Sequence, residues 1–170
     1  MIAGIDSMIL IYAGFVPPNR RKRSADSEDL RVRSKLLLYK LAREKTPIFL
    51  PTVAISELLV PVSKAEKGAL IAALTEKFVC LPFDVRAAAI AADLWSQHKK
   101  LPHDLQYDSR HVLRADAMIV ASVHAAGATD FYSHDRQCRA LADLVMTSHD
   151  LPTDDPGDMF LKDDIRRGDV

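Results

Sequence analysis

Four acidic residues stand at positions where a carboxylate could take part in chemistry. Asp6 and Asp135 each follow a short apolar run of the kind that forms a strand, while Glu57 and Asp116 lie on segments with helical spacing. In parallel sheets, ligands bind beyond the carboxyl ends of the strands, where such residues gather. Carboxylates that meet there repel by several kcal/mol at intermediate dielectric, and a hard divalent cation removes that repulsion. Mg²⁺ or Mn²⁺ held in this way can polarise a phosphoryl oxygen and activate water for phosphodiester hydrolysis.

The strongest single signal is Asp116. Helical spacing places it in the middle of an apolar stripe made of Val112, Ile119, Val120 and Val123. Burying an isolated charge costs several kcal/mol even after relaxation, so an inward carboxylate needs compensation. A buried ion pair or a wet helix edge would also account for this pattern.

The other three acids are weaker signals when each is taken alone. Glu57 shares a helix face with Val53 and Val60, although a partly exposed helical glutamate fits the same pattern. Asp6 and Asp135 could each be the N-cap of the helix that follows. Their combination favours a site, because no cation-rich motif is placed to neutralise the four together.

Alternating apolar and helical segments predict the elements that position these acids. We expect an α/β fold, a three-layer α/β/α sandwich with a central parallel sheet. The predicted strands are 2–5, 47–51, 78–81, 131–133 and 144–147. The predicted helices are 8–13, 30–45, 52–59, 64–77, one that Asp84 caps, 108–126 and 136–142. The helix after Asp84 is expected to bury Ala88, Ala92 and Trp95, and Gly127 is expected to end the helix from 108.

Composition sets bounds on organisation and location. The 170 residues are 48% hydrophobic with no net charge, which predicts one globular domain and excludes a surface that is basic throughout. We expect a domain over 1–147, with a loop insertion at about 17–29, and a tail over 148–170. Met8–Val16 is too short to span a bilayer, so a cytoplasmic protein without membrane contact is expected, and Cys80 and Cys138 are expected to be free thiols.

The 17–29 insertion carries a run of cations, Arg20, Arg21, Lys22 and Arg23. Such a run can bind RNA phosphates, and each phosphate it neutralises adds salt-dependent affinity. A solvated loop without a ligand is the alternative that charge runs more often represent. The six histidines show no paired zinc spacing, and no glycine-rich phosphate loop is present.

Four motifs in order resemble those of PIN domains. Residues 2–7 (IAGIDS) with 10–13 (LIYA) resemble the opening strand, 55–58 (ISEL) the second motif, and 114–121 (RADAMIVA) the third. Residues 127–129 (GAT) and 133–135 (SHD) resemble the closing strand and its terminal acid. The resemblance covers about residues 1–147. Met8 stands where an Asn is frequent, and the insertion and tail exceed the compact members of the family.

The resemblance implies a Mg²⁺- or Mn²⁺-dependent endoribonuclease. It makes Asp6, Glu57, Asp116 and Asp135 the residues that bind metal or position the attacking water, with Ser7 and Ser133 supporting them. Compact prokaryotic relatives are often VapC-type toxins of type II toxin-antitoxin pairs. The family therefore implies an RNA substrate, a small antitoxin partner and a homodimer.

Two other readings compete with a nuclease. Phosphatases of the haloacid dehalogenase type also open with a strand ending in Asp, but they need a second Asp two residues later, where this chain has Met8. A PIN fold without catalysis, serving as an RNA-binding or scaffold module, is the remaining alternative. An RNA cleavage assay in metal against chelator separates these readings.

Overall fold

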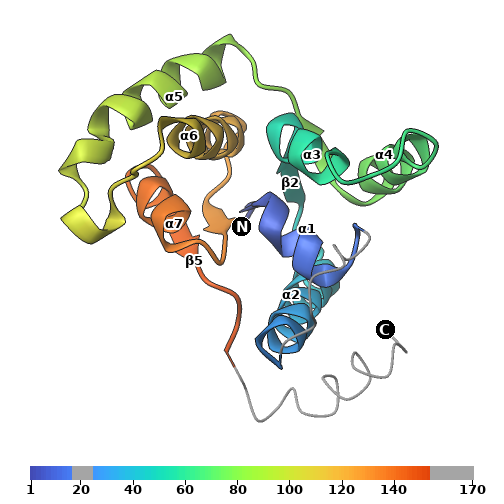
Figure 1. The fold of residues 1–170 in the computed structure, drawn as a ribbon. Helices are drawn as coiled ribbons and strands as arrows, with labels where there is room; N and C mark the ends of the chain where they lie inside the picture. The colour runs from blue at the N-terminus through green and yellow to red at the C-terminus, as the bar shows by residue number, and fades with distance from the viewer. Residues whose placement is uncertain (17–24, 154–170) are drawn as a thin grey trace.

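Strands alternate with helices along the chain in the computed structural model, which describes residues 1–16 and 25–153 (Figure 1). The elements are β1 (Ala3–Ile5), α1 (Ser7–Ala13), α2 (Ala25–Arg43), β2 (Ile48–Pro51), α3 (Thr52–Leu59), α4 (Lys67–Lys77), β3 (Val79–Leu81), α5 (Val85–Gln97), the short 3₁₀ turns η1 (His98–Lys100) and η2 (His103–Leu105), α6 (Arg110–Ala125), β4 (Asp130–Tyr132), α7 (Arg136–Ala142) and β5 (Thr147–His149). No helix within the described ranges has both the length and the apolar character needed to cross a membrane.

The strands form one sheet in the order β3-β2-β1-β4-β5, and every neighbouring pair is parallel. Helices α1 and α2 lie on one side of this sheet, and α6 and α7 lie on the other (Figure 1). The predicted three-layer α/β/α sandwich with a parallel sheet is therefore confirmed. The central strand β1 is buried along its whole length, because both neighbouring strands and both helical layers cover it.

A glycine sets how closely α6 approaches the sheet. A Cβ atom added at Gly4 of β1 would lie 2.8 Å from Cβ of Val123 on α6, a distance that real Cβ atoms do not tolerate. Only glycine therefore lets α6 pack directly on the central strand. This contact holds the rest of α6, including Asp116, over the carboxyl edge of β1.

Three predicted elements begin three or more residues from the predicted position, and one of them is α4, which begins at Lys67 instead of 64. Helix α2 begins at Ala25, so residues 25–29 are helical rather than part of a loop, and pairs between Glu28 and Arg31 and between Asp29 and Arg33 stabilise its first turns. The last strand is Thr147–His149 instead of 144–147, because the amides of 144–146 bond back to carbonyls of α7 and its end. The start of α2 and the position of β5 depend on ion pairs and hydrogen bonds that the residue types in these short segments do not reveal.

Helix α5 also differs from its predicted packing. Asp84 caps it as predicted, accepting a hydrogen bond from the Ala87 amide at 2.8 Å. Its buried residues are Ala87, Ala91 and Leu94, whereas the predicted Ala88 and Ala92 are exposed and Trp95 is only half-buried. Because five of its thirteen residues are alanines spread around the helix, the sequence carries little information about its rotation. Both cysteines are free thiols, as predicted.

Candidate active site

The centre of the candidate site is Asp6, which follows the last residue of β1. Ile5 pairs with Tyr132 of β4, so the next residues, Asp6 and Ser133, lie side by side at the carboxyl edge of the sheet. The Asp6 amide donates to the Tyr132 carbonyl at 3.1 Å, which continues the pairing beyond the strands. Asp6 is only 5% exposed, and the buried Ser133 hydroxyl donates to its Oδ2 at 2.9 Å.

Glu57 reaches the same edge from α3, which begins directly after β2. Oγ of Ser7 lies 2.6 Å from Oε2 of Glu57 and 3.2 Å from Oδ1 of Asp6. A hydroxyl carries one hydrogen, so it cannot donate to both carboxylates. A proton on one of the two carboxyls would let both contacts be hydrogen bonds, and a cation between them would remove their mutual repulsion. The expected inward stripe beside Glu57 was partly wrong, because Val60 is 81% exposed.

Asp116 projects from the middle of α6. Its neighbours Leu113 and Val120, three residues before and four after it, are fully buried, so it lies on the packed face as predicted. Val112 was wrongly included in that stripe, because it is 46% exposed, whereas the predicted Ile119 and Val123 are buried. The hydroxyl of Tyr107 donates a hydrogen bond to Oδ2 of Asp116 at 2.7 Å.

Asp135 occupies a different environment. Its Oδ1 caps α7 by accepting from the amides of Gln137 at 2.7 Å and Cys138 at 3.2 Å, as the capping alternative predicted. Both bonds use Oδ1, so the cap does not occupy Oδ2. Asp6 also stands at an N-cap position, but its side chain makes no capping bond, and capping does not explain it.

The electrostatics of this cluster favour binding of a proton or a cation. Burial raises the pKa of Asp6 and of Glu57, and the charges of neighbouring carboxylates raise both further. Burial, together with the charges of Asp6, Asp135 and Glu57, raises the pKa of Asp116 to about 7, although the Tyr107 hydrogen bond opposes this shift. Within the described residues, none of the four carboxylates forms an ion pair with a Lys, Arg or His.

The oxygen donors of the four acids suit a hard divalent cation in kind, although the spacing of their side chains does not bring three of them around one ion. In the described part of the chain, no three His, Cys, Asp or Glu side chains lie close enough to share one ion. Mg²⁺ usually keeps several waters and binds through one or two carboxylates, so it does not require three protein ligands. An oxygen-only donor set without a cationic partner is the chemistry that Mg²⁺ and Mn²⁺ prefer.

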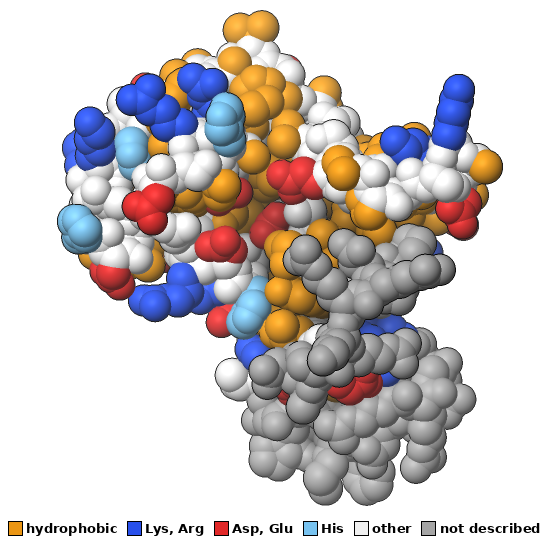
Figure 2. All heavy atoms as spheres, viewed as in Figure 1, with side chains coloured by type: hydrophobic (Ala, Val, Ile, Leu, Met, Phe, Trp, Pro, Cys, Tyr) orange, Lys and Arg blue, Asp and Glu red, His pale blue; other side chains and the backbone are white. Residues whose placement is uncertain are grey.

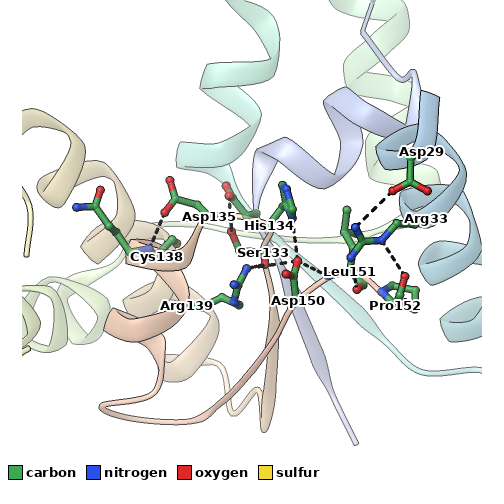
Figure 3. Close-up of polar contacts among 12 residues, drawn as sticks. Asp29, Arg33, Ser133, His134, Asp135, Cys138, Arg139, Asp150, Leu151 and Pro152 are labelled. Atoms are coloured by element: carbon green, nitrogen blue, oxygen red, sulfur yellow. Dashed lines mark hydrogen bonds and ion pairs between the residues drawn. The ribbon is translucent and has the colours of Figure 1, made fainter. Parts of the chain in front are cut away.

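A second polar network braces the loop that carries Ser133 and Asp135 (Figure 3). Nη1 of Arg139 donates to the Ser133 carbonyl at 2.8 Å and lies 3.3 Å from Oδ1 of Asp150. Nδ1 of His134 lies 2.9 Å from the same Asp150 oxygen. Asp150, in the segment after β5, thus contacts the loop through Arg139 and His134, while the Ser133 side chain of the same loop donates to Asp6.

The brace is anchored to α2 through Arg33. Its guanidinium donates to the carbonyls of Leu151 at 2.8 Å and Pro152 at 2.9 Å, and it pairs with Asp29 at 3.5 Å (Figure 3). Burial alone would raise the pKa of Asp150, but hydrogen bonds from His134 and the Leu151 amide hold this pKa below its ordinary value. Asp150 is therefore a paired, ionised carboxylate.

The structure brings the predicted residues together unequally. Asp6, Ser7, Glu57 and Ser133 form one hydrogen-bonded group through their side chains, which Asp135 joins through its backbone amide. The carboxylates of Asp116 and Asp135 act on this group through their charges. Sequence reasoning missed Tyr107, Arg139 and Asp150, for which no periodicity or motif gave a signal. Arg20, Arg21, Lys22 and Arg23 lie outside the described residues.

Comparison with known proteins identifies the family. A sequence model described as the PIN domain matches residues 5–144. A solved structure described as VapBC2 from Rickettsia felis, bound to a DNA fragment from its promoter, has a TM-score of 0.60 at 13% identity. The match covers 89% of this chain and 100% of that chain, and so shows a shared fold. A search of curated protein sequences finds no match. With the family model matching most of its length, the chain belongs to the PIN domain family.

Proposed function

We propose that this protein is a Mg²⁺- or Mn²⁺-dependent endoribonuclease that acts through Asp6, Glu57, Asp116 and Asp135. The observation that carries the proposal is the gathering of these acids at the carboxyl edge of the sheet without a cationic partner among the described residues. A structural charge cluster would contain an Arg or Lys, as the network around Asp150 does. PIN domains are generally nucleases, which supports the same reading.

The residues at the site would have different roles in the hydrolysis. A bound divalent cation would polarise a phosphoryl oxygen and lower the pKa of water. Ser7 and Ser133 fix the rotamer of Asp6, so its carboxylate does not have to reorganise during the reaction. The pKa of Asp116 is raised to about 7, which suits a carboxylate oxygen that accepts a proton from the attacking water, and the pKa of Glu57 is raised above its ordinary value.

One observation favours a second candidate, a PIN fold that binds RNA or scaffolds without cleavage. No three candidate ligands within the described ranges are spaced to share an ion. The desolvation of buried Asp6 and half-buried Asp116 speaks against this alternative, because a protein without catalysis gains nothing from retaining charges that cost stability. Measured turnover distinguishes the two candidates.

We also propose a biological role and partners for this protein. The similar solved structure is a VapBC2 complex, which supports a type II toxin with a small antitoxin partner and a cytoplasmic RNA substrate. A homodimer and RNA contacts by Arg20–Arg23 complete this proposal. Co-purification of the product of a small reading frame next to the gene would test the antitoxin. Light scattering of the purified chain would test the dimer.

The decisive experiment is cleavage of end-labelled RNA in Mg²⁺ or Mn²⁺ against chelator, with mapping of the product ends. In-line attack by water leaves a 5′-phosphate and a 3′-hydroxyl, whereas attack by the ribose 2′-hydroxyl leaves a cyclic phosphate. We expect metal-dependent cleavage with 5′-phosphate ends. Cleavage in chelator that gives a cyclic phosphate would remove the carboxylates from the mechanism.

A further inference from the structure

A pocket of about 580 Å³ opens beside the carboxylates, between the end of α5, the η1–η2 segment and the start of α6. This volume is in the range of pockets that hold small ligands. Its walls combine two aromatic rings with cationic or titratable side chains: Trp95, Tyr107, His98, Lys99 and Arg110. One acidic residue, Asp108, joins them, and the lining therefore carries a net positive charge.

The aromatic wall is preformed. The guanidinium of Arg114 lies over the Trp95 ring, 4.3 Å from its centroid, and holds the indole by a cation–π contact. The η1–η2 segment is tied by Gln106, whose side-chain amide donates to the Leu101 carbonyl at 2.9 Å. Gln137 of α7 donates to the Gln106 carbonyl at 2.7 Å, which joins this wall to the helix that Asp135 caps.

Tyr107 connects the pocket to the candidate active site. Its side chain lines the pocket, and its hydroxyl donates to Asp116. A ligand in the pocket therefore lies one tyrosine side chain away from the carboxylates. The cavity is a neighbouring compartment of the same site.

The distribution of charge around the pocket favours binding of an anionic polymer such as a nucleic acid strand. The protein has no net charge, and a cluster of carboxylates repels a phosphate backbone. Lys, Arg and His side chains gather on this face of the molecule over α5 and the start of α6, while carboxylates lie nearer its centre (Figure 2). Cations beside the carboxylates offset that repulsion where a strand would enter.

We propose that this pocket is a nucleotide subsite for single-stranded RNA, holding one nucleotide that flanks the cleaved phosphate. The base stacks against Trp95 and Tyr107, and Lys99 and Arg110 bind the adjoining phosphates. Aromatic side chains with nearby cations are the means by which proteins hold unpaired bases. The substrate class rests on the proposed function, but binding in the pocket can be measured without cleavage.

Trp95 provides the test, because it is the single tryptophan of the chain. In chelator, the full-length protein is titrated with a short single-stranded oligoadenylate while its fluorescence is recorded. We expect saturable quenching by the oligonucleotide and by adenosine monophosphate at higher concentration. Ribose 5-phosphate, which lacks a base, should not quench.

Charge variants locate the phosphates. Lys99→Gln and Arg110→Gln together should weaken oligoadenylate binding by about tenfold. Each lost phosphate contact should lower the slope of log affinity against log salt by about 0.7. Lys64→Gln is the matched control, because Lys64 is exposed between α3 and α4, on the opposite side of the molecule from η1 and η2 (Figure 1). It should change neither affinity nor slope.

The outcomes separate the pocket from the proposed function. Quenching by RNA without cleavage in Mg²⁺ would support the subsite and overturn the endoribonuclease. Cleavage in Mg²⁺ by a protein whose Trp95 never responds to RNA would overturn the subsite and leave the endoribonuclease standing. Quenching only by a co-purifying protein would assign the pocket to protein docking and would also overturn it.

Discussion

Two groups of carboxylates lie on either side of Ser133, and their environments are opposite. On one side, Asp6 is buried and Asp116 half-buried beside other acids, and desolvation raises both pKa values. On the other side, Asp150 contacts Arg139 and His134, and these partners help to hold its pKa below the ordinary value. An ionised aspartate thus lowers the stability of the fold at Asp6 and Asp116 and raises it at Asp150.

The difference between the groups shows how to separate a site from a structural network. Asp150 has the Arg139 guanidinium beside it and a hydrogen bond with His134, so its negative charge has a partner within the fold. Asp6 contacts two hydroxyls and a backbone amide but pairs with no cation among the described residues, so its negative charge is neutralised only when a proton or cation binds. A carboxylate that lowers stability in the isolated protein is a candidate for function.

The largest effect is expected from Asp116→Asn, which removes one negative charge from the group without cations. Cleavage should fall by about a hundredfold or more, because loss of a metal ligand costs at least as much as loss of a residue that supports one. Far-UV circular dichroism should stay unchanged. Single-turnover cleavage in Mg²⁺ measures the loss, with Asp93→Asn on the exposed face of α5 as the matched control.

The same variant has a predicted pH signature in chelator. The pKa of Asp116 is about 7 in the folded protein and near 3.8 in the unfolded chain, so the folded state binds the proton more tightly. The wild type should therefore lose stability as pH rises through that window, and Asp116→Asn should lose less. Thermal unfolding across pH measures both. Unfolding of the variant at neutral pH would mean that Asp116 belongs to a core ion pair.

A smaller effect is expected from Tyr107→Phe, which keeps the aromatic ring but removes the hydrogen bond to Asp116. The cleavage rate should fall by about tenfold, as for residues that orient a metal ligand. Because the hydroxyl lowers the pKa of Asp116, its removal should move the acid limb of the pH–rate profile to higher pH. RNA affinity should persist, because the ring remains. An unchanged rate and profile would show that the hydroxyl does not position Asp116. Tyr39→Phe on α2 is the control.

The smallest effect is expected from Asp150→Asn, in the group with cations. Its side chain is 40% exposed, so solvent screening limits the loss of stability to about 1 kcal/mol. The lowered pKa means that this contribution is present above the unfolded pKa and is lost as pH falls below it. Urea unfolding at neutral and acid pH should show a difference from wild type only at neutral pH.

A matched variant sharpens that measurement. Asp104 pairs with Arg136 at 3.5 Å, and both side chains are about 70% exposed. Asp104→Asn should therefore leave the stability unchanged. Equal losses from Asp104→Asn and Asp150→Asn would mean that the brace under Ser133 contributes no more than an ordinary surface pair. A loss of stability at acid pH from Asp150→Asn would contradict the ionised, paired state.

Local patterns were sufficient for the architecture and for the candidate acids. Strand-length apolar runs separated by helical spacing predicted the parallel sheet, because a parallel connection requires an intervening crossover. The apolar runs before Asp6 and Asp135 placed these two acids at the carboxyl edge, whereas the register of β1 and β4 that sets Ser133 beside Asp6 came from the structure. The helical period likewise identified Asp116, since a charged residue within an apolar stripe can be recognised from the residues of one helix alone.

Contacts between distant segments were decided only by the tertiary structure. Tyr107 lies just before the helix predicted over 108–126, and its bond to Asp116 depends on how the η1–η2 segment folds over α6. Arg33 is separated from Leu151 by 118 positions, and no local pattern records their contact. The rotation of α5 was also beyond the sequence, because its many alanines give no apolar face a clear advantage until α6 packs against it. Periodicity determines which residues share an element, whereas the close packing of elements determines which charges find a partner.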